Sequence, residues 1–166
     1  PCGGAALYRR DLLDALRGFD ADFFAYLEDV DLAWRARLLG WRCLFQPQAR
    51  VLHAHSATLG DASPLKRFLL GRNKVWLLAK NLPDADLRRH WGTIVGYDAL
   101  AVGYGAATRG DFASLRGRLA GLAGLRTVWP KRRQVQAQTV DAGNWRRFMQ
   151  PRIPPWQVPN RYRHLA

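Results

Sequence analysis

Acidic and aromatic residues of this chain gather in one short stretch, residues 19–34, which reads FDADFFAYLEDVDLAW. Five of the 13 acidic residues lie there, including Glu28, the only glutamate, although the formal net charge of the chain is +13. The helix dipole stabilises acidic side chains in the first turn of a helix. The stretch therefore predicts a helix that begins near Glu28, ends at Gly40 and carries an acidic site at its start.

The charge of the chain changes character near residue 63. Residues 1–63 hold seven Lys or Arg against eight Asp or Glu, whereas residues 64–166 hold 19 against five. The first part suits a folded active-site region, and the second suits an anionic surface such as phospholipid or nucleic acid. The hydrophobic fraction of 48% and the seven tryptophans argue against a disordered chain.

The first part of the chain predicts strands and helices in the order strand, helix, helix, strand, strand. Asp11 is a candidate cap for the first helix, and Gly18 is placed to end it. In the second helix, Asp31 precedes Arg35 by four residues, which predicts an ion pair along one helix face. The expected strands cover residues 3–8, 41–46 and 50–55.

The second part predicts amphipathic helices. From Pro64 an apolar arc repeats at the helical period, and Arg72 falls in the middle of that arc. Because an unpaired buried charge is costly, we expect a carboxylate or a phosphate to meet Arg72. The spacing of Gly92 and Gly96 permits a close approach between helices.

Several features of the second part indicate contact with a membrane surface. Residues 129–133 join a tryptophan to a basic cluster, as interfacial segments often do. No stretch reaches about 18 uninterrupted apolar residues, the usual length of a membrane-spanning helix, so this contact is expected to be interfacial. Cys2 and Cys43 have no spacing of a disulfide framework or a zinc site and are interpreted as reduced cytosolic thiols.

Five segments in this order resemble the C-terminal portion of the inverting glycosyltransferases of family 2. They are GGAALYRR, GFDADFFAYLEDVDLAWR, GWRCLF, VLHAHSAT and GRNKVWLLAKNLP, and the resemblance covers residues 2 to about 83. It is strongest to bacterial rhamnosyltransferase-like members that act on cell-surface polysaccharide or lipid-linked acceptors.

The resemblance implies an α/β fold, the C-terminal part of a GT-A nucleotide-diphospho-sugar transferase, followed by a mainly helical, amphipathic and basic extension. Residues 1–63 would form the acceptor-side part of the catalytic domain. Residues 64–133 would form a basic, membrane-associated helical region, and residues 134–166 an extended, proline-rich tail. The chain begins with Pro1 and its only methionine is Met149, so we interpret it as a piece of a longer protein.

Inverting sugar transfer needs a base for the acceptor hydroxyl and positive charge for the leaving diphosphate. The resemblance makes Asp29 the general base and Glu28 its companion at the acceptor side. An acidic helix start without chemistry is the alternative. The residues that it assigns to substrate binding are Gly3, Gly4, Trp34, Arg72 and Asn73.

Other roles remain open for some of these residues. Trp34 is first a structural residue of its helix, and Arg72 could instead extend along its helix to solvent. His53 matches a family histidine that can reach the metal or the diphosphate, and His55 is the less favoured candidate. The order His-Ala-His departs from the usual His-His-Gly-Ser of the family, and a histidine in a strand can also be structural.

The resemblance further implies a divalent metal, Mg or Mn, whose main ligands lie outside this chain. The pairs Asp20 and Asp22, and Asp29 and Asp31, have the Asp-x-Asp spacing of a metal motif, but they lie in the acceptor-side segment and are interpreted as unrelated to it.

The expected partners are a nucleotide-sugar donor, a glycan or lipid-linked acceptor, an anionic membrane surface and the N-terminal half of the same protein, without which the chain is expected to be inactive. Nucleic acid is not expected. The expected location is cytoplasmic, peripheral at the inner face of the membrane. The alternatives are a basic nucleic-acid-binding module, suggested by the sequence pI of about 11.0, and a non-catalytic scaffold.

Overall fold

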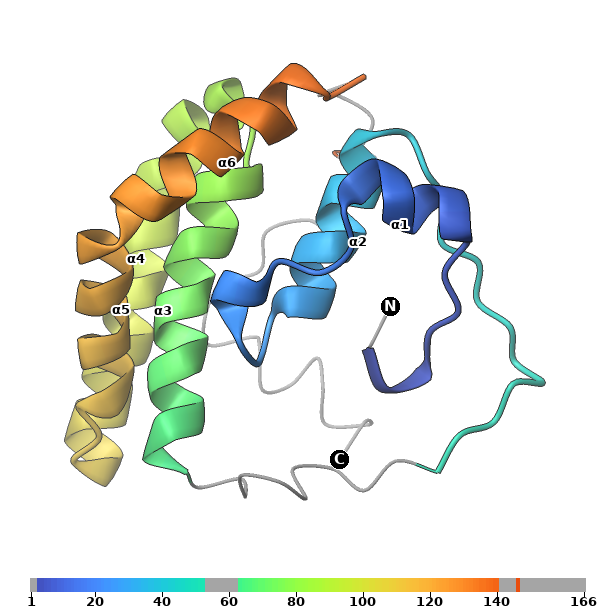
Figure 1. Ribbon diagram of the computed structural model, residues 1–166. Helices are drawn as coiled ribbons and strands as arrows, with labels where there is room; N and C mark the ends of the chain where they lie inside the picture. The colour runs from blue at the N-terminus through green and yellow to red at the C-terminus, as the bar shows by residue number, and fades with distance from the viewer. Residues whose placement is uncertain (1–2, 53–62, 141–145, 147–166) are drawn as a thin grey trace.

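The computed structural model describes residues 3–52, 63–140 and 146, and in these ranges the chain is helical. Long helices pack side by side on one flank of the molecule, α6 crosses them at one end, and α1 and α2 lie on the other flank (Figure 1). The elements are η1 (Gly3–Ala5), α1 (Arg10–Leu16), η2 (Ala21–Phe23), α2 (Glu28–Leu38), α3 (Pro64–Asn81), α4 (Asp84–Arg109), α5 (Ala113–Ala123) and α6 (Leu125–Ala137).

Strands are absent from the described ranges, so the expected α/β class is not confirmed there. The strands expected at residues 3–8 and 41–46 are wrong for this structure. Residues 50–52 are not a strand either, and the rest of that expected strand lies outside the described residues. The physical reason is that a strand needs a neighbour to receive its backbone hydrogen bonds, and no described segment takes that position.

The helix starts follow the sequence closely. The helix α2 begins at Glu28 as expected, and the Arg35 Nε donates to Asp31 Oδ2 at 2.8 Å, which confirms the predicted ion pair. Ser63 caps α3, and Pro64 occupies its first turn, where a missing N–H costs nothing. Asp11 does not cap α1, because it lies inside the first turn and Arg9 holds the cap position.

Helices α3 and α5 approach most closely, and glycines make this possible. A Cβ atom on Gly117 would lie 2.1 Å from the Phe68 carbonyl oxygen, and one on Gly71 would lie 2.5 Å from the Ser114 carbonyl oxygen. The close approach that the spacing of Gly92 and Gly96 permits is not made by any described residue, because a Cβ atom on either glycine would meet no described atom within 4 Å. The glycines of α4 therefore do not serve helix packing among the described residues.

The core joins the acidic stretch to the helical part. Phe23, from the loop before α2, is buried against Trp76 and Leu77 of α3 and Val128 of α6. A second cluster joins Leu38 of α2 to Leu82 and Val135. Helix α6 continues to Ala137, so the first residues of the expected extended tail, from 134 onward, are helical.

Candidate active site

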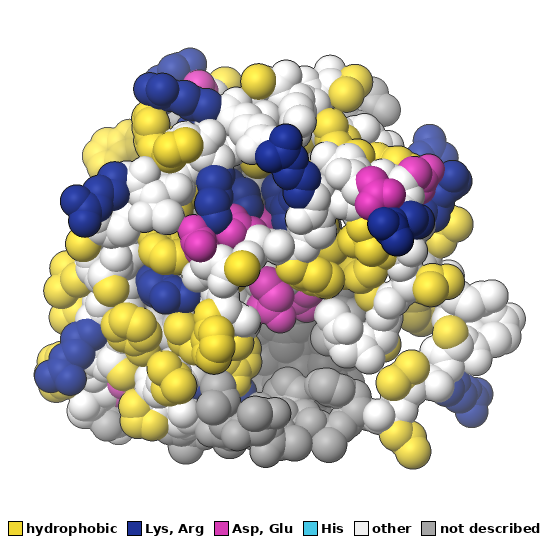
Figure 2. Space-filling view, viewed as in Figure 1, with side chains coloured by type: hydrophobic (Ala, Val, Ile, Leu, Met, Phe, Trp, Pro, Cys, Tyr) yellow, Lys and Arg dark blue, Asp and Glu magenta, His cyan; other side chains and the backbone are white. Residues whose placement is uncertain are grey.

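Asp29 lies in the first turn of α2, beside the start of the described chain. Its Oδ2 accepts a hydrogen bond from the Gly3 backbone N–H at 2.8 Å, and its Oδ1 accepts one from the Val30 N–H at 2.8 Å. An ionised carboxylate offers about four acceptor positions, so these two bonds leave room for a proton. Figure 2 shows acidic side chains at the centre of the viewed face, with basic side chains beside some of them.

Gly3 borders the Asp29 carboxylate, and Glu28 precedes Asp29 in the first turn of α2. A Cβ atom on Gly3 would lie 3.4 Å from Asp29 Cβ and 3.6 Å from Oδ2, so a larger side chain there would cover the carboxylate. Gly4 follows in the same turn and is exposed. The Glu28 Oε2 is enclosed and has no hydrogen-bond partner among the residues that the structure describes. An enclosed acceptor of this kind favours an incoming donor group.

The loop before α2 has an unusual backbone. Phe24, Tyr26 and Leu27 have φ values of 61°, 67° and 67°. Residues other than glycine rarely adopt positive φ values of this kind. Leu27 is the cap residue of α2, and its side chain makes no capping hydrogen bond. The contacts around the loop must therefore hold it in place.

Arg72 meets this loop, not the carboxylate or phosphate that we expected. Its Nη2 donates to the carbonyl oxygens of Asp22 at 3.1 Å and Phe23 at 3.0 Å, and its guanidinium lies over the Trp76 ring at 4.6 Å from the centroid. Burial lowers the pKa of Arg72 from its ordinary value, and the Asp22 charge opposes this change. The guanidinium is directed at the backbone within the protein.

Asn73 is fully buried and forms hydrogen bonds with the same loop. Its Nδ2 donates to three carbonyl oxygens, of Phe23 at 2.9 Å, Ala25 at 2.8 Å and Tyr26 at 2.7 Å. The sequence assigned both Arg72 and Asn73 to substrate binding. The structure places their polar groups on the loop that leads into Asp29.

Asp31 is also fully buried, two residues after Asp29. Its Oδ2 accepts from Arg35 Nε and from Lys80 Nζ at 2.9 Å, and its Oδ1 accepts from Asn81 Nδ2 at 2.8 Å. Arg35 also donates to backbone carbonyls at the end of α1. Asp31 is therefore a structural residue that ties α2 to α1 and α3.

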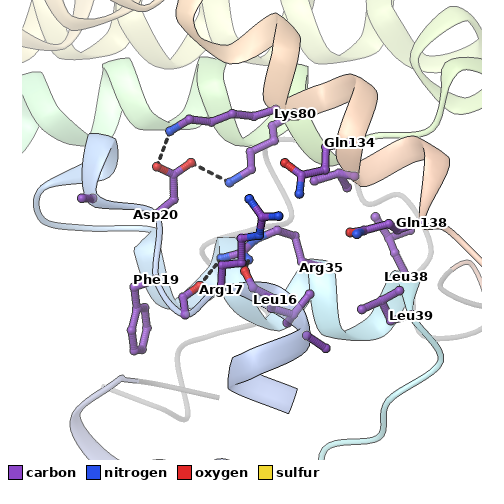
Figure 3. Close-up of a pocket in the computed structure, with 15 residues that line it drawn as sticks. Leu16, Arg17, Phe19, Asp20, Arg35, Leu38, Leu39, Lys80, Gln134 and Gln138 are labelled. Atoms are coloured by element: carbon purple, nitrogen blue, oxygen red, sulfur yellow. Dashed lines mark hydrogen bonds and ion pairs between the residues drawn. The ribbon is translucent and has the colours of Figure 1, made fainter. Parts of the chain in front are cut away.

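Two lysine side chains bind the carboxylates of the first Asp-x-Asp pair, Asp20 and Asp22. Lys131 Nζ donates to Asp20 Oδ1 and to Asp22 Oδ2. Lys80 Nζ donates to Asp20 Oδ2 at 2.7 Å (Figure 3). Burial would raise the pKa of Asp20, but the hydrogen bonds from Lys131 and Lys80 outweigh it and hold the pKa at about 2. Burial would lower the pKa of Lys131, and its hydrogen bonds to the same carboxylates raise it overall.

A metal does not fit this arrangement, because ammonium groups take the positions that a cation would need. No group of three or more His, Cys, Asp or Glu residues that could hold a metal occurs in the described part of the chain. His53 and His55 lie outside that part. The expected metal assignment for them stays a prediction.

Trp34 packs in the core. It contacts the cluster of Phe23, Trp76 and Val128 and also the cluster around Leu38. This packing favours the structural role over the substrate-binding role that the resemblance implied.

A cavity of about 220 Å³ is lined by residues of α1, α2, α3 and α6 (Figure 3). Its lining includes Leu16, Arg17, Leu38, Lys80 and Gln134, but not Asp29 or Gly3. This cavity is separate from the Asp29 carboxylate and is not the candidate site.

Sequence reasoning missed Lys80, Asn81 and Lys131. Lys80 lies seven residues after Asn73, close to the same helix face. That face is outside the apolar arc in which Arg72 falls, so a lysine there gave no signal of a buried partner. Lys131 gave no signal, because its partners lie 111 and 109 residues away in the sequence.

Residues 1–67 match the family described as glycosyltransferase-like family 2. This match confirms, for that segment, the resemblance read from the sequence. Two curated relatives are N-acetylglucosaminyl-diphospho-decaprenol L-rhamnosyltransferases of Mycobacterium tuberculosis, from strains CDC 1551 / Oshkosh and ATCC 25618 / H37Rv. Each is 39% identical over 83 residues, which cover 45% of this chain and 27% of the relative. No solved structure matches.

Proposed function

We propose that this chain is the acceptor-side part of an inverting glycosyltransferase. It would help to transfer a sugar, with rhamnose the first candidate, from a nucleotide-diphosphate donor to a lipid-linked acceptor. The observation that carries the proposal is Asp29, which lies inside the family match, at a helix start and against Gly3. The names of the relatives support the sugar and the acceptor class.

Asp29 would act as the base. As the acceptor oxygen bonds to the anomeric carbon, its proton passes to an Asp29 oxygen, and the bond from that carbon to the diphosphate oxygen breaks. The electron pair leaves with the diphosphate, and attack opposite the leaving group inverts the configuration. Glu28 would accept a hydrogen bond from another acceptor hydroxyl. A positioned base typically contributes about 10²- to 10⁴-fold.

Donor binding is proposed to come from another part of the same enzyme. The side chains of Leu7, Leu44, Phe45 and Leu52 are almost fully exposed, on backbone that forms no helix or strand. Exposed apolar side chains in such number favour a covering partner, and strands of a donor-binding part would cover them. A divalent metal bound there would stabilise the diphosphate charge.

A transfer assay tests the proposed activity. The full-length protein, given a nucleotide-rhamnose donor and a polyprenyl-diphosphate acceptor, should form a glycoside whose anomeric configuration, measured by NMR, is inverted relative to the donor. Retained configuration would contradict the base mechanism. Transfer to a water-soluble glycan but not to the lipid would contradict the acceptor class.

The proposed location is peripheral, at the inner face of the cytoplasmic membrane. No described helix is long and apolar enough to cross a bilayer. Residues 112–140 contain no acidic residue, and the sides of α5 and α6 that face away from α3 are exposed. We call this the α5–α6 face, and its exposed residues are Phe112, Arg116, Leu119, Leu122, Arg126, Trp129 and Arg133.

The basic residues of α5 and α6 form two groups, those that bind partners inside the protein and those that are exposed. Lys131 binds the carboxylates of Asp20 and Asp22, and Arg132 donates to the backbone of α3 and to Asp84. Arg116, Arg126 and Arg133 are exposed and pair with no described acidic residue. Arginines interleaved with Phe, Leu and Trp suit an anionic lipid surface.

Reversing the charge of the α5–α6 face should weaken membrane binding. The variant with Arg116→Glu, Arg126→Glu and Arg133→Glu should lose about 100-fold or more in its partition onto phosphatidylglycerol vesicles, at about 1 kcal/mol for each arginine. The control with Arg10→Glu, Arg42→Glu and Arg50→Glu changes the net charge equally and should bind normally. An equal loss of vesicle binding in both variants would contradict the proposal that the α5–α6 face binds the membrane. Binding of the protein to duplex DNA but not to vesicles would favour a nucleic-acid-binding module.

A further inference from the structure

We infer that Arg72 and Asn73 are positioning residues that fix the loop of residues 22–27 and thereby place Asp29. The inference rests on the proposed function in one respect, the role of Asp29 as the base. It differs from the substrate-binding role that the sequence suggested for this pair. It also gives α3, which lies almost entirely beyond the family match of residues 1–67, a part in catalysis.

The loop needs external support. Three of its residues have positive φ values without being glycine, and such backbone conformations persist only where the surrounding structure holds them. Its carbonyl groups at Phe23, Ala25 and Tyr26 converge on one point, the Nδ2 of Asn73. A carbonyl group that loses such a partner inside the protein stays unsatisfied, so the amide and the loop conformation support each other.

Arg72 fixes the orientation of that amide. Its Nε donates to Asn73 Oδ1 at 2.9 Å, so the amide oxygen faces Arg72 and the amide nitrogen faces the loop. A flipped amide would place two donors against each other at Arg72 and an acceptor against three carbonyls. The Nη2 of the same guanidinium binds the Asp22 and Phe23 carbonyls, so Arg72 and Asn73 hold the loop as one unit.

The same helix also holds the residues that follow Asp29. Lys80 and Asn81 at the end of α3 bind Asp31, and Asn81 and Asp31 are fully buried. The chain before Asp29 and the chain after it are thus both fixed to α3. A shift of about 1 Å in a reacting group can cost about 100-fold in rate, so this double attachment bears directly on the base.

Asn73→Asp is the sharpest test in the full-length enzyme. The side chain keeps its shape, but the donors are lost and a carboxylate faces three carbonyl oxygens. We expect kcat to fall about 10- to 100-fold, while KM for donor and acceptor changes less than about threefold. Hydrogen exchange at the amides of residues 22–31 should become faster.

Arg72→Lys provides the second variant. It keeps the positive charge but loses the forked geometry that joins two carbonyls and Asn73. A positioning role predicts that kcat falls less than in Asn73→Asp and that hydrogen exchange at the amides of residues 22–31 again becomes faster. If KM for the donor rises while kcat and exchange stay normal, Arg72 is a diphosphate ligand and the inference fails.

Leu82→Ala is the matched control for stability. Leu82 is buried in the cluster with Leu38 and Val135, and its truncation should lower the melting temperature of the protein. It should keep a normal kcat below its melting temperature. If Leu82→Ala lowers kcat as much as Asn73→Asp, the effect is general destabilisation and the inference fails. Turnover retained by an Asp29 variant would overturn the proposed function, whereas loop exchange reports on Asn73 independently.

Discussion

Asp29→Asn should reduce kcat for sugar transfer by about 10²- to 10⁴-fold, because an amide cannot take the proton of the acceptor hydroxyl. The fold should tolerate the change. Asp29 is partly exposed, and its carboxylate accepts two backbone hydrogen bonds, one from the Gly3 N–H and one from the neighbouring Val30 N–H. Asparagine keeps one acceptor, so the expected cost in unfolding free energy is about 0.5–1.5 kcal/mol.

Single-turnover rates, donor binding and thermal unfolding of the full-length protein would check this prediction together. Donor binding should remain near wild type. Asp14→Asn is a suitable control, because Asp14 is an exposed acid of α1 whose partner is Arg10, and its loss should leave transfer unchanged. Turnover near the wild-type rate in Asp29→Asn would refute the base assignment, and a large loss in Glu28→Gln alone would move it to Glu28.

Gly117→Ala should destabilise the protein strongly. The new methyl group would lie 2.1 Å from the Phe68 carbonyl oxygen and 2.9 Å from the Phe68 carbonyl carbon, far inside van der Waals contact. Both are backbone atoms of α3, so α5 must move away from α3. Overpacking of this kind costs about 1–3 kcal/mol and sometimes more, and α3 carries the contacts that hold the Asp29 loop.

Gly96→Ala is the matched control for Gly117→Ala. Gly96 is also inside a helix, and its added methyl group would meet nothing within 4 Å. Alanine should stabilise α4 there by about 0.5–1 kcal/mol through helix propensity. Urea unfolding of both variants separates the packing effect from the propensity effect. Equal changes in unfolding free energy would show that α3 and α5 are not in close contact at Gly117.

The parts of the fold that depend on neighbours in sequence could be predicted. The start of α2 at Glu28, the start of α3 at Pro64 and the Asp31–Arg35 pair all follow from interactions within four residues. The local sequence pattern could not decide whether the expected strands form, because a strand is stable only when a neighbouring strand receives its backbone hydrogen bonds. The close approach permitted at Gly92 occurs at Gly117, since both sites have suitable spacing and only packing selects one.

The candidate site shows the same division. Asp29 and Gly3 were both named from the sequence, and the structure brings them into hydrogen-bond contact across 26 residues. Arg72 was recognised as a charge that needs a partner, but its partner was taken to be an anion. A helical wheel shows which face a residue occupies and does not show which backbone carbonyls will converge on it.

The sequence by itself determined the acidic helix start, the family of residues 1–67 and the uneven charge of the two parts of the chain. The tertiary structure decided which basic and polar side chains bind partners inside the protein and which stay exposed. It placed Lys131 on Asp20 and Asp22, Asn73 on the loop before Asp29, and Arg116 at the surface. The physical reason is the sequence distance between partners. Capping bonds and helical ion pairs form within one helical turn, whereas packing selects the partners that lie far apart in the sequence, such as Asn73 and Tyr26, which are 47 residues apart.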